Sequence, residues 1–237
     1  ALPALCEAAR AVGGPGHRSA ATLGGNLCQD TRCIYYNQSA WWREANGFCL
    51  KRGGDTCHVA PQGNRCHAAF SGDLAPVLLA ANAEVEIAAP GGTRRLPLAQ
   101  LYRDDGAAHL ALAPGALLVR VHLRVTAEQR SGYRKARVRA GMDFPLAGVA
   151  VVLQQRDGVI AALGVGLSGT NSMPLALDGT EAWIGRAVDD ELLAALGKQV
   201  SRQVSPMRST VTASNHRRQV AVVLAQRLLH ELANERP

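Results

Sequence analysis

Two neighbouring apolar segments limit the possible folds of this chain more than any other feature. Residues 146–156, LAGVAVVLQQR, and residues 159–168, VIAALGVGLS, are both rich in apolar residues, and Asp157-Gly158 stands between them. An Asp-Gly pair between two such runs is typical of the tight turn in an antiparallel hairpin. The sequence therefore predicts two paired strands here, and residues 133–139, YRKARVR, predict a third strand of the same sheet.

Three helical patterns follow this hairpin, at residues 179–185, 189–204 and 213–232. The last is the clearest, because its apolar side chains recur at helical spacing and form one stripe. That stripe consists of Val220, Val223, Leu224, Leu228 and Leu232. Strands followed by helices predict an α+β domain over residues 131–237, with a three-stranded antiparallel sheet and helices on one of its faces.

The first part of the chain predicts a separate domain over residues 1–125. A helix is expected near residues 2–12, and a short helix and two strands joined by a Gly-Gly turn are expected between residues 74 and 98. Residues 117–125, LLVRVHLRV, alternate as a strand does, and residues 126–132 predict a linker.

The composition excludes several classes of protein. No apolar run reaches the length of about 18 residues that a membrane-spanning helix needs, so no membrane span is expected. The first residues lack the pattern of a secretory signal, and we expect a cytoplasmic protein. The net charge of +7 comes from scattered basic residues without a nucleic-acid-binding motif. We therefore expect no nucleic-acid partner, and Asp104-Asp105 is expected to be a solvated turn.

Four cysteines, Cys33, Cys49, Cys57 and Cys66, lie in one polar segment, with spacings of 16, 8 and 9 residues. Disulfides would need an oxidising compartment. Structural zinc sites are usually built from close cysteine pairs, which this segment lacks. An iron–sulfur cluster is larger, and four thiolates on a long loop can reach it. The spacing favours the cluster, while zinc and disulfides remain alternatives.

The residues around these cysteines agree with an anionic group. Four basic residues lie next to or near them, namely Arg32, Lys51, Arg52 and Arg65. Because four thiolates can complete a cubane site, Cys28 is expected to be a small packed residue, and His58 and His67 are not expected to be ligands.

A second motif, ATLGGN, spans residues 21–26. Paired glycines allow backbone N–H groups to approach an anion closely, and Thr22 and Asn26 add side-chain hydrogen bonds. Alone, such a turn does not establish a ligand. Neither a GxGxxG nor a GxxxxGK[ST] pattern occurs in the chain.

The wider context of this motif resembles a known family. HRSAATLGGNL, followed by SGDLAPVLLAANAEVEI, resembles the FAD-binding medium subunits of the molybdenum hydroxylases, which include xanthine and carbon monoxide dehydrogenases. The resemblance implies a partial FAD-binding domain of the CO dehydrogenase flavoprotein type, followed by the C-terminal α+β domain of such subunits. It also implies an FAD site with no catalytic residue on this chain. The implied FAD-binding residues are Thr22, Gly24, Gly25, Asn26, Asp73, Leu117 and Lys135.

Within this family, residues 28–67 look like an insertion between the GGN motif and the Asp73 segment. The insertion resembles a loop in the flavin subunits of 4-hydroxybenzoyl-CoA reductases, which implies an extra [4Fe-4S] cluster on Cys33, Cys49, Cys57 and Cys66. The resemblance further implies an N-terminal FAD subdomain outside this chain.

The implied role is electron transfer within an oxidoreductase. A low-potential donor such as ferredoxin would supply electrons through [4Fe-4S] and FAD to partner subunits that carry [2Fe-2S] clusters and the molybdenum cofactor. Two alternatives stay open: a flavin subunit of a related molybdenum hydroxylase with another substrate, and a zinc-stabilised interaction protein.

Overall fold

The computed structural model describes residues 2–209 and 212–235. Its larger sheet is antiparallel, with the strand order β4-β5-β6-β7. These strands are β4 (Gln129–Ala136), β5 (Ala147–Arg156), β6 (Val159–Ser168) and β7 (Leu175–Ala176). The predicted hairpin is confirmed, because β5 and β6 pair in antiparallel register from Gly148↔Ser168 to Arg156↔Val159. The predicted three-stranded sheet has a fourth member, the two-residue strand β7, which pairs with β6.

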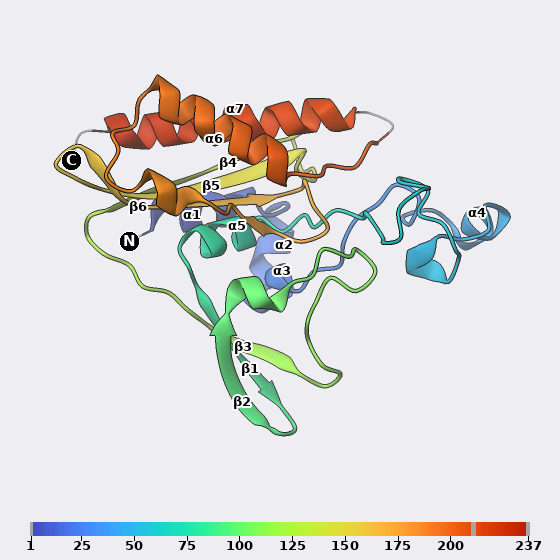
Figure 1. Ribbon diagram of the computed structural model, residues 1–237. Coiled ribbons are helices and arrows are strands. Elements are labelled where there is room, and N and C mark those ends of the chain that lie inside the picture. Colours follow the sequence, from blue (N-terminus) through green and yellow to red (C-terminus); the bar gives the residue numbers. More distant parts are fainter. Residues whose placement is uncertain (1, 210–211, 236–237) are drawn as a thin grey trace.

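Helices cover both faces of this sheet (Figure 1). One face carries α6 (Asp190–Gln203) and α7 (Ser214–Asn234), and the other carries α1 (Pro3–Ala11) and α5 (Leu74–Ala80). The helices of residues 131–237 therefore lie on one face, as expected, while helices from the first part of the chain cover the other face. The reason lies in β5, where Val149 and Val151 face the core under α6 and α7, while Ala150 and Val152 face α1 and α5.

Contact between α5 and β6 is backbone to backbone. A Cβ atom placed on Gly164 would overlap the carbonyl oxygen of Ala80, and one on Gly166 would overlap that of Pro76. Glycine at both positions thus allows α5 to lie directly on the strand. Since α5 follows Asp73, this packing determines where that side chain lies.

The smaller sheet has the strand order β2-β1-β3 and lies below α5 in Figure 1. Its strands are β1 (Glu84–Ala89), β2 (Gly92–Pro97) and β3 (Leu117–His122), and η2 (Leu98–Leu101) follows β2. The predicted Gly-Gly hairpin is confirmed, because β1 pairs with β2 through Ala89↔Gly92. Its core contains Val85, Ile87 and Leu101, which pack with Leu27 and Phe70.

Three local expectations need correction. Residues 21–26 were expected to form a turn, but most of them belong to the helix α3 (Leu23–Leu27), which follows a second short helix, α2 (Pro15–Ala20). The expected helix at 179–185 is a single 3-10 turn, η3 (Thr180–Trp183). The segment expected to be a linker ends inside the sheet, because β4 already begins at Gln129. In each case tertiary contacts order a segment that has little periodicity of its own.

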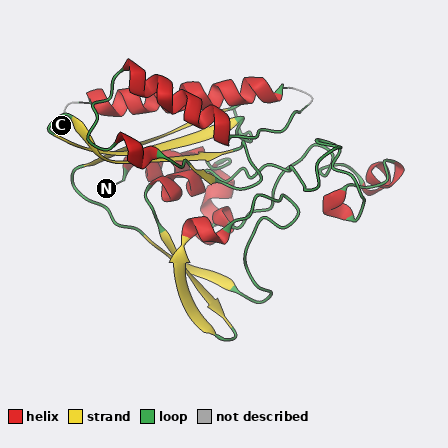
Figure 2. Cartoon of the chain, in the orientation of Figure 1, coloured by secondary structure: helices red, strands yellow, loops and turns green. Residues whose placement is uncertain are grey.

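The segment from residue 28 to residue 67 extends away from both sheets and contains α4 (Ala40–Ala45) and η1 (Leu50–Arg52). Most of it is loop, as Figure 2 shows. Among the described residues, no helix has both the length and the apolar character needed to cross a membrane.

Candidate functional site

Five of the predicted cofactor residues line one cavity, which we call the GGN cavity. They are Thr22, Gly25, Asn26, Asp73 and Lys135. The cavity encloses about 1560 Å³ of atom-free space, part of which is open to solvent. Its walls come from α2, α3, β4 and the loop that follows β4, so segments more than a hundred residues apart meet here.

The GGN motif forms the first turns of α3. Thr22 caps this helix, and its Oγ1 accepts a hydrogen bond from the N–H of Gly25 at 3.0 Å. The Asn26 Oδ1 accepts a hydrogen bond from the N–H of Leu74 at 3.1 Å. Asn26 therefore ties α3 to the start of α5 and places the GGN motif beside Asp73.

Asp73 is a buried carboxylate with two side-chain donors from β4. Its Oδ1 accepts a 2.6 Å hydrogen bond from the hydroxyl of Tyr133, and its Oδ2 pairs with the Lys135 Nζ at 2.9 Å. Both members of this ion pair are only 6% exposed. Burial raises the pKa of Asp73 above its ordinary value, although the charges of Lys135 and Arg137 and the hydrogen bonds act in the opposite direction.

Two predicted residues do not line the GGN cavity. Leu117 is 65% exposed at the start of β3. Its neighbour Leu118 instead lies against Gly24, whose added Cβ would be 3.5 Å from the Leu118 carbonyl oxygen. Gly24 therefore serves the contact between α3 and β3.

Sequence reasoning missed most of the other lining residues of the GGN cavity, among them His17, Arg32, Arg139 and Phe144. Arg139 pairs with Asp143 at 3.4 Å. The Arg32 guanidinium lies 5.3 Å from the centre of the Phe144 ring, and no carboxylate of the described residues pairs with it. The basic run YRKARVR was a signal for Arg139, but nothing local connected Phe144 with Arg32.

The four clustered cysteines line a second, smaller cavity, which we call the cysteine cavity. Cys33, Cys49, Cys57 and Cys66 all contribute to its wall, and its volume of about 260 Å³ includes space that is open to solvent. Cys28 does not line this cavity. All six cysteines of the chain are free thiols, so the disulfide alternative is not realised.

Burial dominates the electrostatics of two thiols in this cavity, those of Cys66 and Cys33. It raises the pKa of Cys66 to about 11, and the nearby Cys57 and Cys33 add to this effect, while the N–H of Ala68 and the charge of Lys51 oppose it. Burial likewise raises the pKa of Cys33. Without a metal these two thiols are therefore protonated at neutral pH, and metal binding there would release protons.

The last cysteine is held by the main body of the protein. Arg65 pairs with Asp104 at 2.8 Å, and Asp105 accepts the N–H of Cys66 at 3.2 Å. The Ser172 hydroxyl donates to the Cys66 carbonyl oxygen at 3.1 Å. The expectation of a merely solvated turn at Asp104-Asp105 was therefore wrong, because both carboxylates fix the end of the insertion.

Aromatic side chains surround the cysteine cavity unevenly. Tyr35 and His58 both line it, and their rings lie 5.3 Å apart. Trp42 also contacts Tyr35, at 6.2 Å between ring centres, whereas Trp41 is 71% exposed on α4. Only part of the aromatic cluster thus shields the thiols from water.

The two sites are neighbours. A third cavity is lined by Cys33 and shares Arg32, Ser71 and Phe144 with the GGN cavity. The Arg32 backbone is fixed by two 2.8 Å hydrogen bonds with Ala69. The segment that carries the first cysteine is therefore also part of the wall of the GGN cavity.

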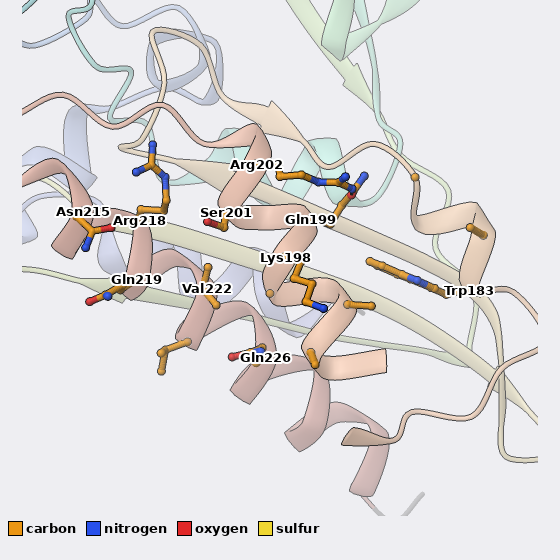
Figure 3. Close-up of a pocket in the computed structure, with 16 residues that line it drawn as sticks. Trp183, Lys198, Gln199, Ser201, Arg202, Asn215, Arg218, Gln219, Val222 and Gln226 are labelled. Carbon is orange, nitrogen blue, oxygen red and sulfur yellow. The ribbon is translucent and has the colours of Figure 1, made fainter. Parts of the chain in front are cut away.

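A wide groove between α6 and α7 lies apart from these sites (Figure 3). Lys198, Arg218 and Val222 lie on its walls, with Trp183 at one end. None of the predicted site residues lines it.

This arrangement corresponds to a known pair of domains. The profile described as "FAD binding domain in molybdopterin dehydrogenase" matches residues 1–124, which is more than half of the chain. The chain belongs to this family. A second profile, described as "CO dehydrogenase flavoprotein C-terminal domain", matches residues 131–232 of this chain.

Curated relatives agree with the family. The chain is 34% identical over 190 residues to the aldehyde oxidoreductase FAD-binding subunit PaoB of Escherichia coli (strain K12), covering 75% of this chain and 58% of that protein. It is 24% identical over 233 residues to the putative xanthine dehydrogenase FAD-binding subunit XdhB of the same organism. That alignment covers 97% of this chain and 66% of that protein. This family member thus spans about three fifths to two thirds of those relatives.

Solved structures show the same fold. The CO dehydrogenase from Oligotropha carboxidovorans superposes with a TM-score of 0.75 at 21% identity, covering 98% of this chain and 68% of that chain. Quinoline 2-oxidoreductase from Pseudomonas putida 86 superposes with a TM-score of 0.61 at 18% identity. The superposition covers 76% of this chain and 64% of that chain.

The family supports FAD as the cofactor, and the GGN cavity has suitable chemistry for it. Gly25 of the glycine pair and three cationic side chains, Arg32, Lys135 and Arg139, line the cavity, which suits a diphosphate. The four thiols of the cysteine cavity are of the residue type that binds zinc or an iron–sulfur cluster. In the described parts of the chain, no three His, Cys, Asp or Glu side chains are grouped so as to hold a metal ion, and this finding applies equally to zinc and to iron.

Proposed function

We propose that this chain is the FAD-binding, electron-transfer part of a molybdenum hydroxylase complex whose substrate reacts on another subunit. The observation that carries this proposal is the convergence of the GGN motif, Asp73 and Lys135 on one cavity in a member of this family. The relatives are named as FAD-binding subunits, which agrees with such a division of labour.

The chain's own residues would hold the cofactor rather than react. The N–H groups of the α3 turn and the nearby cations would bind the diphosphate, and the Asp73–Lys135 pair would offer a buried polar contact to the nucleotide. FAD, when bound, supplies exchange of one or two electrons.

We further propose a [4Fe-4S] cluster held by Cys33, Cys49, Cys57 and Cys66. Three observations support it: the four thiols line one cavity, carboxylates are missing from the described lining, and Lys51 brings a positive charge. The short path from Cys33 through Arg32 to the GGN cavity supports electron exchange between the two sites.

The substrate is the least constrained part of the proposal. The insertion favours 4-hydroxybenzoyl-CoA reductase, in which case a ferredoxin-like donor and partner subunits with [2Fe-2S] clusters and the molybdenum cofactor are expected. The relatives favour the broader alternative, a molybdenum hydroxylase with another substrate such as an aldehyde or a purine.

One preparation tests these proposals. Anaerobically purified full-length protein should contain FAD, iron and acid-labile sulfide, with about four iron atoms per chain for one cubane cluster. The complex should then be assayed with reduced donor and 4-hydroxybenzoyl-CoA, and separately with aldehydes and purines. Absence of FAD would refute the flavin role, whereas turnover of an aldehyde alone would refute only the narrower substrate.

A cysteine variant tests the ligand set. Cys49→Ser should remove most of the iron and sulfide but leave FAD bound, because Cys49 lines the cysteine cavity and not the GGN cavity. Cys28→Ser is the matched control, since it lies in the same insertion outside the cysteine cavity. Unchanged iron content in Cys49→Ser would contradict the ligand assignment.

A further inference from the structure

One cation lies at the cysteine cavity itself. Lys51 follows Cys49 by two residues on η1, and its side chain is only 7% exposed. It lines the same cavity as the four cysteines. Its neighbour Arg52 is exposed and does not line the cavity.

Several contacts fix the Lys51 ammonium in place. Its Nζ donates to the Asp30 Oδ1 and to the Thr31 Oγ1, each at 2.6 Å. It also lies 4.5 Å from the centre of the Tyr36 ring, a distance suited to a cation–π contact. Thr31 is fully buried and donates its hydroxyl hydrogen to the carbonyl oxygen of Gly106, so the anchor of Lys51 is itself rigid.

The carboxylate partner compensates this charge only in part. The side chain of Asp30 is 52% exposed, whereas that of Lys51 is 7% exposed. Water therefore screens the carboxylate, while the ammonium lies largely out of water. A buried cation with a screened partner is stabilised by further negative charge nearby, and the thiol side of the cavity is where such charge can develop.

We propose that Lys51 is the charge-compensating residue of the cysteine cavity and sets the reduction potential of the cluster held there, an inference that rests on the proposed [4Fe-4S] site. One-electron reduction by an external one-electron donor adds one negative charge to the cluster and involves no bond or proton transfer at Lys51. The fixed positive charge favours the reduced form and so raises the potential. Lys51 acts as a positioning residue through its charge, and the cysteines remain the ligands.

The test is a redox titration of anaerobically purified full-length protein, followed by electron paramagnetic resonance. Lys51→Met should lower the equilibrium constant for cluster reduction about tenfold, a shift of about 59 mV to more negative potential. Asp30→Asn should shift the potential in the opposite direction by a smaller amount, because it removes the partly screened counter-charge. Arg52→Met removes the same charge from an exposed position in the same loop, so it should leave the potential unchanged.

The outcomes separate the two proposals. Wild-type protein without iron and sulfide would overturn both the cluster and the role of Lys51. Wild-type protein with a cluster, but equal shifts in Lys51→Met and Arg52→Met, would overturn only the role of Lys51. If Lys51→Met fails to retain iron, the Asp30→Asn variant decides the question. A reduction potential above that of wild type supports the role of Lys51, and an unchanged or lower potential overturns it.

Discussion

Removing the charge of Lys135 is the most informative perturbation of the GGN cavity. Lys135→Met leaves the Asp73 carboxylate buried without its cation, since both side chains are only 6% exposed in the pair. Loss of one partner of a buried ion pair costs about 3–5 kcal/mol. The 2.6 Å hydrogen bond from Tyr133 remains, so we expect a loss of unfolding free energy near the lower limit, about 3 kcal/mol at pH 8.

The loss should depend on pH in a defined direction. Burial already raises the pKa of Asp73 above 3.8, and Lys135 is the largest opposing influence, so its removal raises this pKa further. A carboxyl group whose folded-state pKa is raised stabilises the fold at low pH and loses that contribution as the pH rises through the folded pKa. The difference between variant and wild type should therefore be largest at pH 8 and shrink as the pH falls towards 3.8.

Urea unfolding of FAD-free protein at several pH values measures this difference, and the double variant Asp73→Asn/Lys135→Met is the control. The double variant buries no uncompensated charge, so it should recover most of the lost stability and show no such pH dependence. A Lys135→Met variant as stable as wild type at pH 8, or a deficit that does not change between pH 8 and pH 5, would refute this account of the site.

Two further substitutions test the packing that positions the cavity. Gly166→Ala should lower the free energy of unfolding in urea by about 1–3 kcal/mol, because the new methyl group overlaps the carbonyl oxygen of Pro76 in α5. Gly91→Ala is the control, since it has open space around it and should leave the stability unchanged. Asn26→Ala should lower the free energy of unfolding by about 1 kcal/mol, because the N–H of Leu74 loses its acceptor. The same variant should bind FAD more weakly in a fluorescence titration. FAD affinity equal to wild type would show that α3 is held without this bond.

Local sequence patterns were sufficient for the regular elements. The β5–β6 hairpin followed from two apolar runs around Asp157-Gly158, and α7 from one apolar stripe. Where periodicity was weak, expectation and structure differed: the GGN turn is the start of a short helix, because Thr22 caps it and Asn26 bonds to α5. The cap by Thr22 is a local contact with Gly25, but the bond from Leu74 to Asn26 spans 48 positions and has no signal within a short window of sequence.

The sequence placed four cysteines in one polar segment, and these cysteines line one cavity. The family resemblance, rather than any local pattern, named Asp73 and Lys135 as candidates. Only the tertiary structure decided which partners these groups have. Asp73 meets Tyr133 across 60 positions, and Asp104 reaches across the chain to hold Arg65 beside Cys66. Such contacts arise when α5 lies on β6 and the insertion folds back onto the main body. Their energy depends on burial and distance in space, and neither quantity is encoded in the local periodicity from which the elements were predicted.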